Sequence, residues 1–291
     1  MIEALSIHTP RTLAEAVEML DGWGPDAALY AGGTELVVLL KYGLAVYERL
    51  IDLKSLPELQ SIEVEDGAAS IGAVATYQDL LRHSGLRRQW GELSRMIRQQ
   101  GNPRVWAAGT LGGNLSFAEP HSDPATLLIS WRAELECAGA AGVRRVPVED
   151  FIHGPLQTDL GPSEVITRII LARQGVRSGT GFQRLSMLER PTANAAVSLG
   201  TDGNGRVQHA TAVVGAVGPS ATRVTDAEEI MVDTTVNELA ERADHIAVVV
   251  SESVEPLEDG HGSADYKRHL AGELTRRALL EALAKLGNSG S

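Results

Sequence analysis

Residues 109–128 read GTLGGNLSFAEPHSDPATLL, with three glycines within five positions, then an asparagine and a short acidic stretch before an apolar run. Glycine inside an ordered segment costs conformational entropy, so such a cluster indicates a backbone that bends sharply or is closely approached by another group. A second cluster, LYAGGTEL at residues 29–36, has the same character. Two such segments in one chain suggest that both serve a single ligand.

Composition limits the class of protein. The chain has 291 residues, of which 43% are hydrophobic and 22% charged, an ordinary balance for a globular protein of one or two domains. The apolar run VVLLKYGLAV is interrupted by Lys41 and Gly43, and the first residues lack a basic region followed by an apolar one. We therefore expect a cytoplasmic protein without membrane insertion.

Charge and cysteine usage exclude further classes. The net charge of -12 disfavours binding to nucleic acid or anionic lipid, so an anionic ligand would have to be held by backbone N–H groups. Cys137 is the only cysteine, which excludes an iron–sulfur cluster or a thiolate zinc site built from this chain alone. The eight histidines include no closely spaced ligand pair, and His153 and His261 are interpreted as loop residues. No metal site and no catalytic residue is predicted.

Hydrophobic patterns predict the elements of the first part of the chain. Helices are expected at 12–20, 35–43, 76–85, 86–100 and 124–131, and strands at 27–30, 49–53, 61–65 and 68–75, with the last two joined at Asp66-Gly67. The glycines of 109–113 are expected in a long loop. Ser122 or Asp123 is expected to cap the helix that begins at Pro124.

From residue 133 to residue 218, the hydrophobic pattern predicts mainly strands. Segments 133–140, 143–151 and 164–171 are predicted strands, and a glycine-rich polar stretch at 172–182 is a plausible linker. Beyond it, strands follow one another at 181–187, 194–200 and 207–218 without intervening helices, which predicts an antiparallel sheet. A long helix is expected from Ser263.

The first glycine segment has the chemistry of a phosphate site. After a strand, Gly32 and Gly33 can direct successive N–H groups to one side, and the following helix adds its free N–H groups and positive dipole end. Thr34 can add a hydroxyl. Neither segment, however, has the GxGxxG or GxxxxGK[ST] spacing, and two ordinary tight turns would explain the same local patterns.

The second segment leaves similar alternatives open. Gly112 and Gly113 remove side chains where a ligand could approach, while Asn114 tolerates left-handed geometry and offers an amide. Asp123 could be a helix cap. It could equally accept a hydrogen bond from a sugar hydroxyl or a ring N–H.

Three segments together carry a family resemblance. LYAGGTEL, GTLGGNLSFAEPHSDPA and SADYKRHLAGELTRRALLEAL at 263–283 resemble the FAD-binding medium subunit of molybdenum hydroxylases, the family of carbon monoxide dehydrogenase and of the flavin domain of xanthine dehydrogenase. The resemblance runs from about Ile2 to Leu286. Its specific feature is AGGT combined with T-[LI]-GGN and an aspartate nine residues after the asparagine.

The resemblance implies the fold. It implies an α+β chain in which a two-subdomain FAD-binding fold of the vanillyl-alcohol-oxidase (PCMH) type, with FAD between the subdomains, precedes a smaller α+β domain that contains an antiparallel sheet. The implied boundaries are 1–176 for the FAD-binding domain, with subdomains of about 1–56 and 57–176, and 177–288 for the C-terminal domain.

The resemblance also implies cofactor contacts. Carried over position by position, the residues expected to bind FAD are Ala31, Gly32, Gly33, Thr34, Glu35, Leu36, Thr110, Leu111, Gly112, Gly113, Asn114, Asp123 and Ile166. Contacts by Gln183 or Arg184 and by Glu189–Thr192 are weaker implications, because some relatives carry lysine where this chain has Gln183.

The resemblance implies a function in electron transfer. FAD in this chain would take electrons from [2Fe–2S] clusters of a small subunit, after hydroxylation at a molybdopterin site of a large subunit, and deliver them to an external acceptor. The implied assembly is a heterotrimer that often pairs into a dimer of heterotrimers. Cys137 alone cannot supply the four-cysteine cluster found in one branch of the family. Neither substrate nor acceptor is specified.

Two other hypotheses remain at this point. One is a self-sufficient FAD-dependent reductase of related fold, although no acid–base constellation stands out for it. The other is a non-redox scaffold whose glycine segments are only turns.

Overall fold

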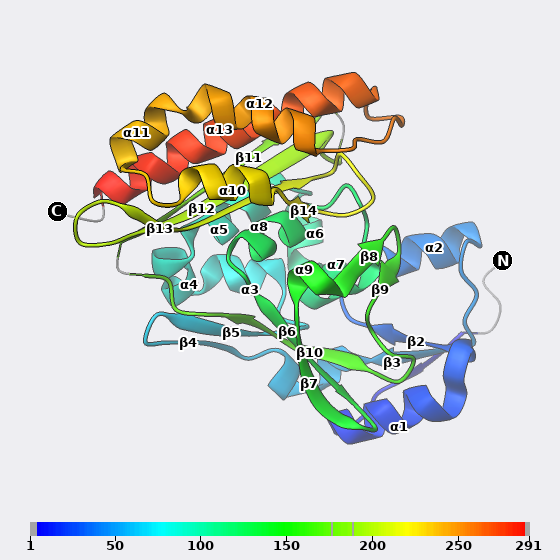
Figure 1. The fold of residues 1–291 in the computed structure, drawn as a ribbon. Helices are drawn as coiled ribbons and strands as arrows, with labels where there is room; N and C mark the ends of the chain where they lie inside the picture. Colours follow the sequence, from blue (N-terminus) through cyan, green and yellow to red (C-terminus); the bar gives the residue numbers. More distant parts are fainter. Residues whose placement is uncertain (1–4, 176, 188, 289–291) are drawn as a thin grey trace. The chain divides into compact units, whose positions relative to one another are not determined.

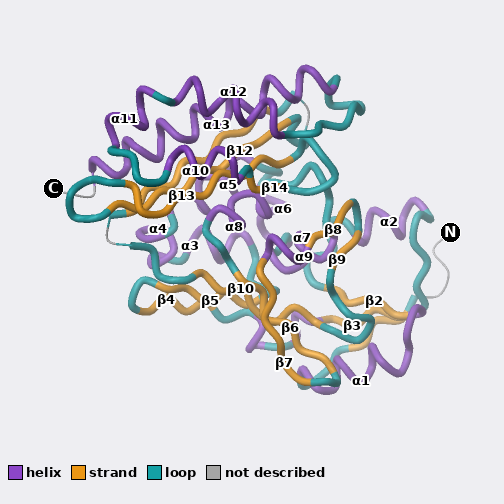
Figure 2. Tube along the Cα trace, viewed as in Figure 1, coloured by secondary structure: helices purple, strands orange, loops and turns teal. Residues whose placement is uncertain are grey.

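The computed structural model describes residues 5–175, 177–187 and 189–288, and the chain divides into two compact units (Figures 1 and 2). Unit 1 comprises the chain up to Phe117 together with Glu134–Phe151 and Gln157–Leu171. Unit 2 comprises Ala118–Ala133, Ile152–Leu156 and the chain from Ala172 onward. The segment that contains Asp123 therefore groups with residues that follow much later in the sequence.

A three-stranded parallel sheet begins unit 1, with strand order β1-β3-β2. Its strands and neighbouring helices are β1 (Ser6–His8), α1 (Leu13–Trp23), η1 (Gly24–Asp26), β2 (Ala27–Tyr30), α2 (Leu36–Tyr42), β3 (Arg49–Asp52), η2 (Leu53–Ser55) and η3 (Pro57–Leu59). The side chain of Thr12 caps α1 as predicted, and α1 packs Ala16, Val17 and Leu20 into the core. The predicted order of strand, glycine segment, helix and strand is confirmed.

The second sheet of unit 1 has five antiparallel strands in the order β4-β5-β10-β6-β7. These strands are β4 (Ile62–Glu65), β5 (Ala68–Gly72), β6 (Glu134–Gly139), β7 (Gly142–Pro147) and β10 (Val165–Leu171). Asp66 and Gly67 both have positive φ, 48° and 86°, as a two-residue hairpin turn requires. β7 is shorter than predicted, because Val148–Phe151 form the short helix α9. The two-residue strand β9 (Gln157–Thr158) also lies in this unit.

Five helices of unit 1 connect β5 to the end of its first continuous segment. They are α3 (Tyr77–Arg82), α4 (Ser84–Gln89), α5 (Gly91–Gln99), α6 (Pro103–Ala108) and α7 (Leu111–Phe117). Thr76 and Asp79 form the predicted capping box of α3. The helix predicted over 86–100 is broken, because Trp90 has φ -124° and ψ 44°, outside the helical region. The expectation of a long glycine loop is also wrong, since Gly112, Gly113 and Asn114 lie inside α7.

The sheet of unit 2 is antiparallel as predicted, with strand order β11-β12-β13-β14. Unit 2 contains α8 (Pro124–Ser130), β8 (Ile152–Gly154), β11 (Ser178–Leu185), β12 (Ala193–Thr201), β13 (Val207–Gly215), β14 (Thr222–Arg223), α10 (Thr225–Met231), α11 (Val236–Glu241), α12 (Ala243–Ser253) and α13 (Ala264–Asn288). Helices α12 and α13 run along one face of this sheet (Figure 1).

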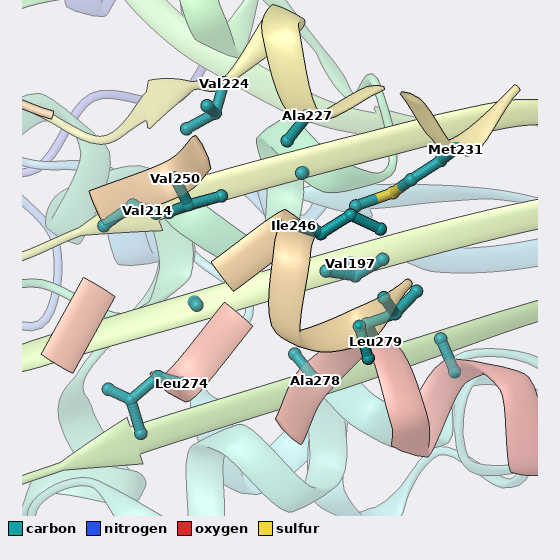
Figure 3. Close-up of a cluster of buried hydrophobic side chains, with 14 of the residues drawn as sticks. Val197, Val214, Val224, Ala227, Met231, Ile246, Val250, Leu274, Ala278 and Leu279 are labelled. Carbon is teal, nitrogen blue, oxygen red and sulfur yellow. The ribbon is translucent and has the colours of Figure 1, made fainter. Parts of the chain in front are cut away.

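Alternation along β12 determines what covers each face of this sheet. Ala193, Ala195 and Val197 point into an apolar cluster with α10, α12 and α13, part of which is shown in Figure 3. Asn194 points to the opposite face, where α8 contacts β12 and β13. The long helix α13 lies so close to β11 that an ideal Cβ at Gly179 or Gly181 would overlap a carbonyl group of α13. Glycine at these two positions permits this close packing.

Candidate functional site

The two glycine segments lie against each other in unit 1. An ideal Cβ at Gly32 would overlap the backbone carbonyl of Ala108, and one at Gly113 would lie 3.9 Å from the Cβ of Ala31. Glycine at position 32 is therefore needed for the packing of the chain itself, before any ligand is considered. The expectation that the two segments could serve one ligand gains a geometric basis.

The first glycine segment contains a row of backbone N–H groups without a hydrogen-bond acceptor among the described residues. Gly33 has φ 69°, a left-handed conformation that favours glycine, and its carbonyl accepts the N–H of Val37. Within the described residues, no acceptor is found for the N–H groups of Gly32, Gly33 and Thr34. Successive unpaired N–H groups in a turn that leads into a helix are a suitable arrangement for an anionic oxygen.

Other residues of the first segment take different positions. Glu35 occupies the N-cap position of α2 without a side-chain capping bond, and Leu36 is the first helical residue. Thr34 is exposed and Ala31 is half-buried. Gly43 ends the helix with φ 69°, as predicted from the sequence.

A basic side chain, which the sequence patterns did not reveal, lies beside the first glycine segment. Lys54 Nζ donates to the carbonyl of Ala31 at 3.1 Å, pairs with Asp52 Oδ1 at 2.7 Å and lies 3.5 Å from the centroid of the Tyr30 ring. No local pattern marks this lysine, because its place depends on β3 lying beside β2. The first glycine segment is thus accompanied by an ion pair, Lys54–Asp52.

The second segment is shaped by Thr110. Its Oγ1 accepts the N–H of Gly113 at 3.0 Å and its carbonyl accepts the N–H of Asn114, so Thr110 caps α7. Gly112 donates its N–H to the carbonyl of Ala73, and a Cβ at Gly112 would come within 2.6 Å of that residue. Asn114, which could tolerate left-handed geometry, is helical in the structure, and Ala118 has a positive φ of 49°.

Ile166 and Leu111 belong to the apolar surroundings of this region. Leu111 is fully buried and Ile166 is 4% exposed. Ile166 lies on β10 opposite Cys137 of β6, next to an irregularity of the ladder between Ile166 and Arg168. Because α7 packs on β10, both residues are held by the core of unit 1.

Asp123 lies in unit 2 as a buried acceptor. It is 2% exposed, its Oδ2 lies 3.1 Å from Arg184 Nε, and its Oδ1 accepts from Asn194 Nδ2 at 2.8 Å. Burial raises the pKa of Asp123, while the charge of Arg184 and the hydrogen bond from Asn194 act in the opposite direction. Asp123 precedes α8 but makes no side-chain capping bond, so the capping alternative is wrong for this residue.

The structure separates the two weaker candidates on β11. Gln183 Nε2 donates to Glu281 Oε2 on α13 at 2.8 Å, whereas Arg184 faces Asp123. Adjacent residues of a strand point to opposite faces, so only one of the two can share a site with Asp123. This geometry favours Arg184. Of the segment Glu189–Thr192, Thr192 is buried at 1% exposure.

A cluster of charged and aromatic side chains in unit 2 was also missed. His121 and His261 stack with ring centroids 4.2 Å apart, and His121 Nε2 lies 2.9 Å from Asp259 Oδ2. Lys267, 1% exposed, places Nζ 2.6 Å from the same carboxylate oxygen. Burial first, and then the charge of His121, lower the pKa of His261. Three loop residues, His121, Asp259 and His261, form this cluster together with Lys267 of α13, so the interpretation of His261 as a simple loop residue was incomplete.

Metal binding and membrane insertion find no support in the described parts of the chain. No group of three or more His, Cys, Asp or Glu side chains there could hold a metal ion. None of the helices in those parts is long and apolar enough to cross a bilayer.

Two known families match the sequence in tandem. The family described as "FAD binding domain in molybdopterin dehydrogenase" matches residues 3–173, and the family described as "CO dehydrogenase flavoprotein C-terminal domain" matches residues 188–282. Among curated proteins, the carbon monoxide dehydrogenase medium chain of Hydrogenophaga pseudoflava is 31% identical over 281 residues, 96% of each chain. The xanthine dehydrogenase FAD-binding subunit of Escherichia coli O157:H7 is 27% identical over 292 residues, 99% of each chain.

Solved structures give the same result. A chain of the carbon monoxide dehydrogenase from Hydrogenophaga pseudoflava superposes with a TM-score of 0.92 at 31% identity, covering 98% of this chain and 99% of that chain. A chain of quinoline 2-oxidoreductase from Pseudomonas putida 86 gives a TM-score of 0.90 at 29% identity, with the same coverage. The predicted fold class and the resemblance are confirmed, and the chain belongs to the family of FAD-binding subunits of molybdopterin dehydrogenases.

Proposed function

We propose that this chain binds FAD and works as the electron-transfer subunit of a molybdenum-containing hydroxylase or dehydrogenase. The observation that carries the proposal is the contact between the two glycine segments, beside which the N–H groups of Gly32, Gly33 and Thr34 have no acceptor among the described residues. A diphosphate needs such a set of donors and needs no side chain in its way. The residues present therefore fit the cofactor that the family implies.

The proposed contacts follow the glycine segments. Residues Ala31–Leu36 are proposed to hold the diphosphate, and Thr110–Asn114 to form the second FAD segment. Ile166 is proposed as an apolar flavin contact and Asp123 as a hydrogen-bond acceptor for the cofactor. The proposed domain limits are 1–176 for FAD binding, with subdomains of about 1–56 and 57–176, and 177–288 for the C-terminal domain.

The chain's own residues bind and orient the cofactor in this mechanism. FAD, when bound, supplies the redox chemistry, since it exchanges electrons singly or in pairs. The glycines admit the diphosphate to the backbone, and Thr110 keeps the N–H of Gly113 engaged so that the start of α7 retains its shape. Lys54, which is ion-paired with Asp52, donates to the carbonyl of Ala31 and so helps to hold the backbone of the first segment.

The proposed partners are a large molybdopterin subunit and a small subunit that carries two [2Fe–2S] clusters. Several relatives are named as medium chains or medium subunits, which designates one chain of a larger complex. Cys137 alone cannot bind an iron–sulfur cluster, so electrons must come from another chain. We propose a dimer of heterotrimers in the cytoplasm, with no contact to nucleic acid.

The test compares the isolated chain with the co-expressed complex. The isolated chain is expected to take up FAD and become yellow, but to keep its flavin absorption when organic substrates are added. The complex is expected to lose that absorption upon addition of its substrate and to reduce an acceptor dye. A folded chain that takes up no FAD would refute the proposal. Rapid bleaching of the isolated chain by a substrate would favour the self-sufficient reductase instead.

A further inference from the structure

Buried side chains of unit 2 form a hydrogen-bonded network that leads from Thr126 through Asn194 to Asp123, and Asp123 forms an ion pair with Arg184. Thr126 Oγ1 donates to Asn194 Oδ1 at 2.8 Å. Asn194 Nδ2 donates to Asp123 Oδ1 at 2.8 Å and to the carbonyl of Ser122 at 3.1 Å. Arg184 Nε lies 3.1 Å from the other carboxylate oxygen. Thr126 and Asn194 are both fully buried, so water does not replace these bonds.

Chemistry dictates the orientation of the Asn194 amide. An ionised Asp123 and the carbonyl of Ser122 can only accept hydrogen bonds, so they must face the NH₂ group of Asn194. The amide oxygen then faces Thr126, the hydroxyl of which can donate to it. If the amide were turned by half a rotation, its oxygen would face two acceptors. The Thr126 hydroxyl therefore stabilises the orientation in which Asn194 serves Asp123.

Packing leaves these linked side chains little freedom to rearrange. Asn194 on β12 is in register with Gly215 on β13, and an ideal Cβ at Gly215 would overlap both Asn194 Oδ1 and Thr126 Oγ1. The polar pair thus occupies the space that any other residue at 215 would fill. Thr126 comes from the first turn of α8 and Arg184 from β11, so regular elements hold every member except Asp123.

We propose that Thr126 and Asn194 are positioning residues for cofactor binding. Thr126 orients the amide of Asn194, Asn194 holds the carboxylate of Asp123, and Asp123 in turn holds the guanidinium of Arg184 for FAD. The proposal rests on the proposed function, because FAD is the ligand that Asp123 and Arg184 would meet. Neither Thr126 nor Asn194 needs to touch the cofactor.

The first experiment uses Thr126→Val, which keeps the shape of the side chain and removes the hydroxyl. The dissociation constant of FAD, measured by quenching of flavin fluorescence on the full chain, is expected to rise about 10-fold, as the loss of one buried hydrogen bond allows. Thr126→Ser restores the hydroxyl and should return most of the affinity. Thr275→Val is the matched control, because Thr275 is equally buried and its hydroxyl bonds only to the carbonyl of Ala271 within α13.

A second variant and a spectroscopic measurement keep the test decisive if Thr126→Val folds poorly. Asn194→Asp retains the shape but replaces the donor with an oxygen that faces Asp123, so FAD binding should weaken more than in Thr126→Val. The visible circular dichroism of bound flavin should change in both variants and remain unchanged in Thr275→Val. All samples are compared at the same folded fraction, determined by far-ultraviolet circular dichroism.

The outcomes separate this inference from the proposed function. Wild-type affinity and wild-type flavin dichroism in both Thr126→Val and Asn194→Asp would overturn the inference and leave FAD binding intact. An equal loss in Thr275→Val would also overturn it, since the effect would then reflect general stability of unit 2. A wild-type chain that binds no FAD would refute the proposed function itself.

Discussion

The α-carbon of Gly32 lies directly against the backbone carbonyl of Ala108, so closely that an ideal Cβ at Gly32 would overlap both atoms of that group. This contact joins the middle of the first glycine segment to the residue just before the second. Any side chain at position 32 would force the two segments apart, and with them the donors that we propose to bind FAD.

Gly32→Ala should therefore reduce both stability and FAD content. Overpacking against a backbone carbonyl is expected to cost about 1–3 kcal/mol of unfolding free energy. Gly22→Ala is the control, because Gly22 lies in α1 with open space around its α-carbon. That change should raise stability by roughly 0.5–1 kcal/mol, since alanine favours the helix. Urea unfolding and bound flavin per chain measure the two effects, and equal behaviour of both variants would contradict the contact.

Gly113→Val addresses the space that the cofactor needs. A Cβ at Gly113 would lie 2.9 Å from Thr110 Oγ1 and 3.9 Å from the Cβ of Ala31, so most of the added side chain would extend beside the first glycine segment. We expect a folded protein with little FAD. Gly22→Val, the same change at a helical glycine with open space around its α-carbon, should retain its flavin. If Gly113→Val binds FAD as tightly as the wild type, the second segment does not contact the cofactor.

Asp123→Ala and Asp79→Ala should differ strongly, although both aspartates lie at the start of a helix. Removal of Asp123 takes away the carboxylate that pairs with the mostly buried Arg184, which is expected to cost about 2 kcal/mol or more of unfolding free energy and to weaken FAD binding. Asp79 is part of an exposed capping box, and its loss should cost about 1 kcal/mol. Thermal unfolding and flavin content at matched folded fraction distinguish the two. A similar loss in both would show that Asp123 is only structural.

Glu164 should make stability depend on pH in the acidic range. Arg144 holds its carboxylate with two bonds of 2.7 Å, and this interaction lowers the pKa of Glu164 below 4.5. A lowered pKa means that the stabilisation is complete above the unfolded-state pKa and is lost as pH falls below it. Glu164→Gln should cost about 1 kcal/mol at neutral pH, because Arg144 is partly exposed and the pair is screened. Urea unfolding at neutral pH and near about pH 3.5 should show this difference shrinking. A constant difference would contradict the assignment.

Cys137 should be chemically inert in the folded protein. Its side chain lies on β6 in the core of unit 1, and burial raises the pKa of the thiol to about 11. Both access and thiolate formation are therefore unfavourable. Ellman's reagent should modify the native chain very slowly and the urea-unfolded chain completely. Fast reaction of the native chain would show that this part of the sheet opens.

Local sequence patterns were sufficient for much of the architecture. The caps at Thr12 and Thr76, the hairpin at Asp66-Gly67 and the stop at Gly43 depend on interactions within a few residues, so a short window contains the whole cause. The antiparallel sheet of unit 2 followed from successive strand patterns without helices between them. The spacing of the two glycine segments and Asp123 was enough to indicate the family.

Only the tertiary structure decided how these residues are used. Gly112 donates its N–H to the carbonyl of Ala73 and packs against that residue, a contact between distant parts of the sequence that no short window contains. Asp123 meets Asn194 across 71 positions of sequence. Such pairings depend on strand register and on which face a residue occupies, properties that arise when distant segments pack and that no local pattern contains.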